Sequence, residues 1–70
     1  RLYIEYFAEA KACLKAGLAI AAYDYILKCS HTFNLLDARG AISKDERQKY
    51  ILDIRSLAEA ASKLYLKEAD

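Results

Sequence analysis

Seventy residues allow one domain with a modest hydrophobic core. The net charge is +1 with acidic and basic side chains interspersed, which is unlike the strongly basic surface of a dedicated nucleic-acid-binding domain. No apolar run approaches the roughly 20 residues that cross a bilayer, and no stretch has the pattern of a signal peptide. The chain contains no Met, so we interpret it as a piece of a longer soluble protein.

The cysteines and the single histidine do not form a metal site. Cys13 and Cys29 lack a Cys-x-x-Cys spacing, and His31 alone cannot complete a set of four zinc ligands. Reduced thiols of a cytoplasmic protein are the simplest interpretation. His31 has no neighbouring catalytic group in the sequence, so we expect it to be a surface or packing residue.

Two glycines divide the chain into three segments of helical length. Pro is absent, and the only glycines are Gly17 and Gly40, the residue type that usually follows a helix end. The expected helices span about residues 2–16, 21–39 and 44–66, and no segment shows the sustained alternation typical of a strand. Short links make consecutive helices antiparallel, so the sequence predicts an all-α, up-down-up three-helix bundle.

Each segment carries an apolar stripe at helical spacing, which we expect to face the core. The inward residues expected are Leu2, Tyr3, Tyr6, Phe7, Ala10, Cys13 and Leu14 in the first segment, Ala22, Ile26, Cys29, Phe33 and Leu36 in the second, and Tyr50, Ile51, Ile54, Leu57, Ala58, Ala61 and Tyr65 in the third. Leu27 and Leu35 fall on the far side of the second segment. That segment is therefore expected to pack against more than one neighbour.

The third helix has a clear start signal. In a capping box, the Ser43 hydroxyl accepts from the backbone amide of Glu46 and the Glu46 carboxylate accepts from that of Ser43. Acid-before-base pairs at a spacing of four residues, including Asp45 with Lys49, are expected on the solvent side.

The turn at Gly40 also sets which residues face each other. Residues whose numbers sum to about 84 should be opposite in antiparallel helices, which matches Phe33 with Ile51 and Asp37 with Arg47. The pair Asp37–Arg47 is expected to fix the angle between the second and third helices. Losing one partner would cost roughly 3–5 kcal/mol if the site is buried and far less if it is wet.

No residue cluster in the sequence predicts catalysis, cofactor binding or metal binding. A weaker pattern consists of Arg39, Lys44 and Arg55, which are placed to touch RNA phosphates. Asp45 and Glu46 interrupt this pattern, so a contact with a protein subunit remains an alternative use for these side chains.

The region around Gly40 also contains the most distinctive sequence in the chain. An unbroken run, KCSHTFNLLDARGAIS, spans residues 28–43, with Ala-Tyr-Asp-Tyr before it at residues 22–25 and Glu46-Arg47, Tyr50-Ile51 and Ile54-Arg55 after it. From Ala22 to about Tyr65 the sequence resembles the C-terminal helical domain of the alpha chain of the bacterial two-subunit glycyl-tRNA synthetase. The first helix matches only in pattern. The family usually has Pro where this chain has Ala21, and Val-Thr in place of residues 44–45, which leaves the start of the second helix less defined.

The resemblance implies a division of labour within a class II ligase. Glycine would be joined to its tRNA through glycyl-adenylate, with ATP and Mg²⁺ bound by an alpha-chain catalytic domain that precedes this segment. The implied partners are that domain, a second alpha chain, two beta chains and the tRNA for glycine. The segment itself would be inactive and would support subunit or domain assembly in the cytoplasm. A tRNA-contacting module of the same enzyme, or a free-standing helical adaptor, remains open at this point.

Overall fold

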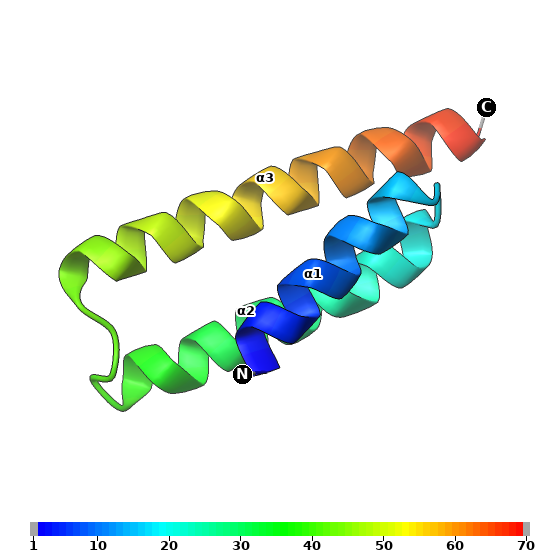
Figure 1. Ribbon diagram of the computed structural model, residues 1–70. Helices are drawn as coiled ribbons and strands as arrows, with labels where there is room; N and C mark the ends of the chain where they lie inside the picture. Colours follow the sequence, from blue (N-terminus) through cyan, green and yellow to red (C-terminus); the bar gives the residue numbers. More distant parts are fainter. Residues whose placement is uncertain (1, 70) are drawn as a thin grey trace.

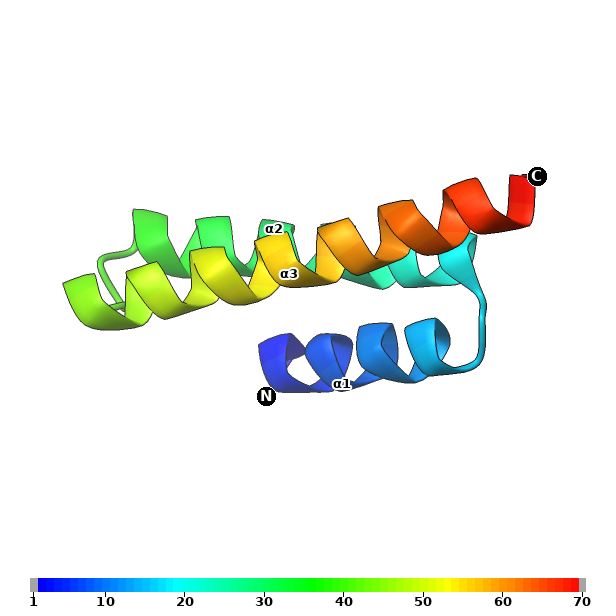
Figure 2. The same ribbon diagram turned by 90° about the horizontal axis from the view of Figure 1, so that it is seen from above.

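A computed structural model describes residues 2–69, and the side chains of residues 2–67. It contains α1 (Leu2–Lys15), α2 (Ala19–Ala38) and α3 (Lys44–Ala69), with no strand in that range. The all-α class is thereby confirmed. Figure 1 shows the helices lying along one another, joined by a tight turn after α1 and a longer loop after α2. Contacts among all three helices are compatible with the expected up-down-up order. In Figure 2, α1 lies to one side of the α2–α3 pair.

The helix bounds differ from the expected ones by more than one residue at two places. The second helix begins at Ala19, two residues before the expected start, and the third continues to Ala69 instead of ending near residue 66. No side chain caps α2, whose N-cap is Leu18. Because α2 starts without a polar cap, the sequence contains no signal that marks its first residue. The third helix runs past the expected end because no Gly or Pro follows Leu66 to stop it.

The turn at Gly17 ends α1 as the sequence predicts. Gly17 has a φ of +78°, in the left-handed region that glycine adopts without a steric penalty. The amide of Leu18 donates to the carbonyl of Cys13 at 2.8 Å, and that of Gly17 donates to Leu14 at 3.1 Å. This pair of bonds is a Schellman motif, which satisfies the last carbonyls of the helix and reverses the chain.

The core consists of two adjoining clusters. The first contains fully buried alanines that let the helices approach closely, and the second contains aromatic side chains. The buried members are Ala10, Ala22, Ile26, Leu57 and Ala61 in the first cluster, and Tyr3, Cys29 and Phe33 in the second. Each stripe expected from the sequence contributes to these clusters. Ile51 packs on the second cluster with Phe33, and Ala58 packs on the first with Ile26, as the register around Gly40 requires.

Two stripe residues were assigned wrongly to the core. Leu2 is 58% exposed and Tyr65 is 48% exposed. Both lie near ends of helices, where the correct helical phase does not guarantee a neighbour. Leu2 is the first described residue of α1, and Tyr65 lies near the end of α3.

Both thiols are free, and they differ in burial. Cys29 is fully buried in the aromatic cluster, while Cys13 is half-buried. Burial raises the pKa of the Cys29 thiol, because the charged thiolate is disfavoured away from water. Cys29 therefore acts as a small apolar core residue.

Tyr3 carries the one buried polar atom without a partner among the described side chains. Its ring packs edge-on against Tyr50 with centroids 4.5 Å apart, and its hydroxyl has no hydrogen-bond partner. Burial, and to a smaller extent the nearby Cys29 and Asp53, raises the pKa of Tyr3 far above its usual value. The hydroxyl therefore stays neutral and uncompensated.

Replacing Tyr3 by Phe is expected to raise the free energy of unfolding by about 1 kcal/mol, because an orphaned buried hydroxyl costs roughly 1–3 kcal/mol. Urea unfolding of the two proteins measures the difference. Tyr65→Phe, at an exposed position, is the matched control and should change stability by less than about 0.5 kcal/mol. A loss of stability in Tyr3→Phe would mean that the hydroxyl has a partner after all.

Candidate functional site

Backbone hydrogen bonds define the connection between α2 and α3. Gly40 has a φ of +68°. The amide of Ala41 donates to the carbonyl of Leu36 and the amide of Gly40 donates to that of Asp37, both at 3.0 Å. This is a second Schellman motif, and α3 begins only four residues after Gly40.

The start of α3 contains the capping box that its sequence predicts. The Ser43 amide donates to the Glu46 carboxylate at 3.0 Å, and the Glu46 amide donates to the Ser43 hydroxyl at 3.2 Å. Two backbone donors at the helix start are thus satisfied reciprocally. The cap fixes where α3 begins relative to the Gly40 turn.

Asp37 and Arg47 meet across this connection. Arg47 Nε donates to Asp37 Oδ2 at 3.2 Å, and the two side chains are 56% and 33% exposed respectively. The pair is therefore wet, and its contribution belongs to the range of about 0.2–1 kcal/mol for exposed ion pairs. The larger loss expected for a buried pair does not apply.

Two further ion pairs lie on the outer surfaces. Lys28 Nζ lies 3.3 Å from Asp24 Oδ2, as the sequence pattern indicates. Lys49 pairs with Asp53 at 2.7 Å, whereas the spacing had suggested Asp45 as a partner. Asp53 follows Lys49 by four residues, and its side chain is 31% exposed. The hydrogen bond from each lysine raises the pKa of Lys28 and of Lys49.

The three basic residues considered for RNA contact are all exposed but do not form one patch. Arg39 follows the end of α2, while Lys44 and Arg55 lie on α3. The latter are eleven residues apart, or about 16 Å along the helix axis. Phosphate-binding surfaces concentrate positive charge more than this.

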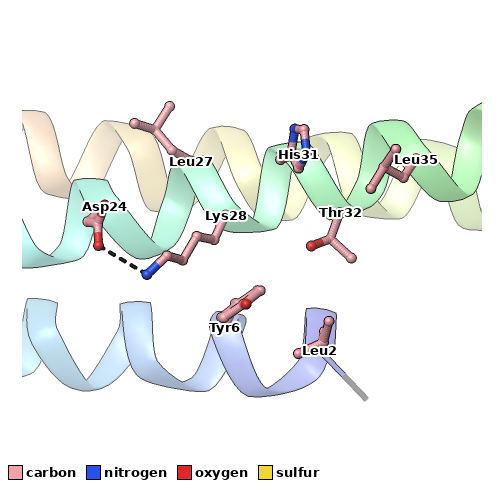
Figure 3. A pocket seen from close by; sticks show the side chains of 8 residues that line it. All are labelled: Leu2, Tyr6, Asp24, Leu27, Lys28, His31, Thr32 and Leu35. Carbon is pink, nitrogen blue, oxygen red and sulfur yellow. Dashed lines mark hydrogen bonds and ion pairs between the residues drawn. The ribbon is translucent and has the colours of Figure 1, made fainter.

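A shallow hollow, which we call the Leu27 hollow, lies between α1 and α2 (Figure 3). Its volume is about 320 Å³. The main lining residues are Leu2 and Tyr6 from α1 and Leu27, Lys28, His31 and Leu35 from α2. Leu27 is 67% exposed and Leu35 is 50% exposed, so large apolar side chains are presented to solvent.

Lys28 forms part of one wall of this hollow together with aromatic rings. Its Nζ lies 4.9 Å from the centroid of the Tyr25 ring and 5.8 Å from that of Tyr6, while it donates to Asp24. The ion pair with Asp24 and the cation–π contacts with the two tyrosine rings together hold the Lys28 ammonium group against the helices. The stem of Lys28 adds to the apolar wall.

A second hollow, the Arg39 hollow, lies at the first turn of α1 and has a volume of about 390 Å³. It shares Leu2, Thr32 and Leu35 with the Leu27 hollow. The residues that it adds are Tyr3, Ile4, Leu36, Arg39 and Tyr50. Sequence reasoning missed both hollows, although the outward positions of Leu27 and Leu35 were a signal for the first.

The side chains in these hollows are suited to binding another surface through apolar contacts. His31 is exposed between Leu27 and Leu35, and the one carboxylate lining the Leu27 hollow, that of Asp24, accepts from Lys28 (Figure 3). No group of three or more His, Cys, Asp or Glu side chains within residues 2–69 is arranged to hold a metal ion. Apolar side chains in a solvent-filled depression are typical of a contact surface.

A family model for the glycyl-tRNA synthetase alpha subunit matches residues 1–70, the whole of this sequence. The chain belongs to that family. The match includes the first helix, which the sequence had related to the family only by its pattern. The chain is thereby part of an aminoacyl-tRNA ligase, and the designation alpha subunit implies a synthetase with several chains. In the described part of this alpha-subunit chain, no helix has the length and hydropathy to cross a membrane.

Replacing Ser43 by Ala should lower the free energy of unfolding by about 1 kcal/mol through loss of the cap, and Asp37→Ala should lower it by about 0.2–1 kcal/mol through loss of the exposed ion pair. Denaturant unfolding at low and at 0.5 M salt separates the two effects. Salt should remove most of the Asp37 effect and leave the Ser43 effect, because only the ion pair is screened.

Glu46→Gln is the control, since Gln preserves the capping box. An Asp37→Ala loss above about 2 kcal/mol, unchanged by salt, would contradict the assignment of a wet ion pair.

Proposed function

We propose that this segment is a non-catalytic helical domain of the glycyl-tRNA synthetase alpha chain, arranged as an up-down-up bundle, and that it supports subunit or domain assembly. The adenylate-forming residues, with ATP and Mg²⁺, belong in this proposal to a catalytic domain that precedes the segment. The partner chains are a second alpha chain and two beta chains, working in the cytoplasm. The family match supports the assignment to this enzyme, and the exposed apolar surface of α2 supports the role in assembly.

The observation that carries the assembly role is the exposed apolar surface of α2. Leu27 and Leu35 are two turns apart on one face of the helix, with His31 between them (Figure 3). Burying one such leucine is worth roughly 1.5–3 kcal/mol, and a small isolated domain gains nothing by leaving two in water. Contact with another part of a multi-chain enzyme would remove Leu27 and Leu35 from water and so explains their outward position.

A tRNA-contacting role has less support. Arg39, Lys44 and Arg55 are spread over the surface, and Asp45 and Glu46 add negative charge beside them. A free-standing adaptor has less support still, because the family match extends over all 70 residues.

The isolated segment is expected to show no glycine-dependent ATP–pyrophosphate exchange, because the two hollows offer no phosphate-binding loop and no reacting group. The complete synthetase, assayed in parallel, provides the positive control. Exchange above background by a homogeneous preparation of the segment would overturn the assignment of the chemistry to another domain.

Replacing Leu27 by Ser in the complete alpha chain is expected to weaken association with the other chains of the synthetase at least about tenfold, because a leucine contact worth about 1.4 kcal/mol or more is lost. Analytical ultracentrifugation or a binding titration measures the change. Leu52→Ser on α3 is the matched control, since Leu52 is exposed to a similar degree but lies outside both hollows. Equal affinity in both variants would argue against α2 as the assembly surface.

A further inference from the structure

The outward face of α2 is symmetric about His31. Leu27 lies four residues before His31 and Leu35 lies four residues after it, so the three side chains follow one another along α2 (Figure 3). All three are exposed, and all three line the Leu27 hollow. A stripe that reads the same in both directions is complementary to a second copy of itself, because a two-fold axis reverses one helix relative to the other.

We propose that this stripe, which we call the Leu27–Leu35 face, pairs with the same face of a second copy of the chain around a two-fold axis beside His31. The pairing rests on the proposed function, in which a second alpha chain is a partner, and it names the surface at which the two chains meet. In antiparallel helices related by this axis, facing residues have numbers that sum to about 62. Leu27 of each copy then packs against Leu35 of the other, and both leucines leave water.

The charges on α2 fit the antiparallel orientation. Lys28 faces Asn34 of the second copy, whose neutral side chain does not repel it. Asp24, which accepts from Lys28 through Oδ2, comes beside Arg39 of the second copy. The guanidinium group of Arg39 has no hydrogen bond or ion pair with the residues that the structure describes. A parallel pair would instead set Lys28 against Lys28 and Asp24 against Asp24, so charge complementarity favours the antiparallel pair.

His31 lies beside the axis and therefore faces its own copy. A neutral imidazole carries one N–H donor and one acceptor nitrogen, so two of them can form a hydrogen bond with each other. The charged groups that line the hollow, Asp24 and Lys28, are paired with each other, and α1 adds Leu2 and Tyr6. The hollow thus has no unbalanced charge that would favour a highly charged occupant over a copy of this chain.

The size of the face determines which protein the test must use. Eight residues line the Leu27 hollow, whereas a stable interface between separate proteins uses roughly 20–30 residues a side. We therefore expect the Leu27–Leu35 face to fix how two alpha chains meet, with other parts of the complete alpha chain adding contacts. The complete alpha chain is the protein to study.

The test is disulfide formation between complete alpha chains that carry one introduced cysteine on this face. His31→Cys meets its own copy at the axis, so it should form an inter-chain disulfide by itself. Leu27→Cys and Leu35→Cys should each fail alone and should crosslink when the two variants are mixed. Copper phenanthroline serves as the oxidant, and peptide mass spectrometry identifies the bond and separates it from those of Cys13 and Cys29.

The matched control is Leu52→Cys on α3, at a position that is exposed to a similar degree and lies outside both hollows. Crosslinking of His31→Cys is expected to be at least about tenfold faster than that of Leu52→Cys. The mixture of Leu27→Cys with Leu35→Cys should exceed either variant alone by a similar factor. If His31→Cys does not fold, this mixture tests the same arrangement.

Equal rates in His31→Cys and Leu52→Cys would overturn the proposal. Crosslinking of Leu27→Cys with itself as fast as in the mixture would also overturn it, because that result requires parallel helices. Loss of the His31→Cys disulfide when the beta chain is added would assign the face to the beta chain instead of a second copy.

These outcomes are separate from those of the proposed function. Loss of association in Leu27→Ser without crosslinking of His31→Cys would retain the assembly role and remove only the second copy as the partner of this face. Crosslinking of His31→Cys with unchanged association in Leu27→Ser would retain the pairing and remove its role in assembly.

Discussion

The left-handed backbone at Gly40 is the constraint on which the rest of the structure depends. It ends α2 in a Schellman motif, and the capping box at Ser43 starts α3 a few residues later. Between two such defined ends, α3 has one register against α2. That register brings Phe33 and Ile51 into one cluster and places Arg47 against Asp37. An L-residue with a Cβ at Gly40 would meet no neighbour but would still be strained by its positive φ. Glycine is therefore required at position 40 by the backbone conformation and not by lack of space for a side chain.

Much of this arrangement could be predicted from the sequence, because the signals are local. Glycine at a helix end, a capping box and a 3.6-residue period each act over a few residues. The register followed from adding residue numbers across one turn, and the contact between Asp37 and Arg47 agrees with it. The solvent exposure of that contact was left open, because register determines which residues face each other and not how deep the facing positions lie.

The features that the sequence did not predict depend on how the helices pack together, which no local pattern encodes. Leu2 and Tyr65 have the correct phase for the core, yet both stay about half exposed to solvent near the ends of their helices. Both hollows lie between side chains of α1 and α2, and Tyr50 of α3 also lines the second. The choice of Asp53 over Asp45 as the partner of Lys49 is a matter of side-chain conformation on an exposed surface, where several arrangements differ by only a few tenths of a kcal/mol.

The composition of the core explains why so much apolar surface remains outside it. Hydrophobic residues make up 56% of the chain, but the largest side chain that is fully buried is that of Cys29. Alanines such as Ala10 and Ala22 bring the helices close together and bury little apolar area each. Large residues such as Ile20 and Leu27 are left on the surface as a result. A core of this kind gives a defined shape with a small free energy of unfolding. Any contact that binds only the folded form adds directly to that free energy, so the same exposed leucines that would join the segment to the synthetase would also stabilise its fold.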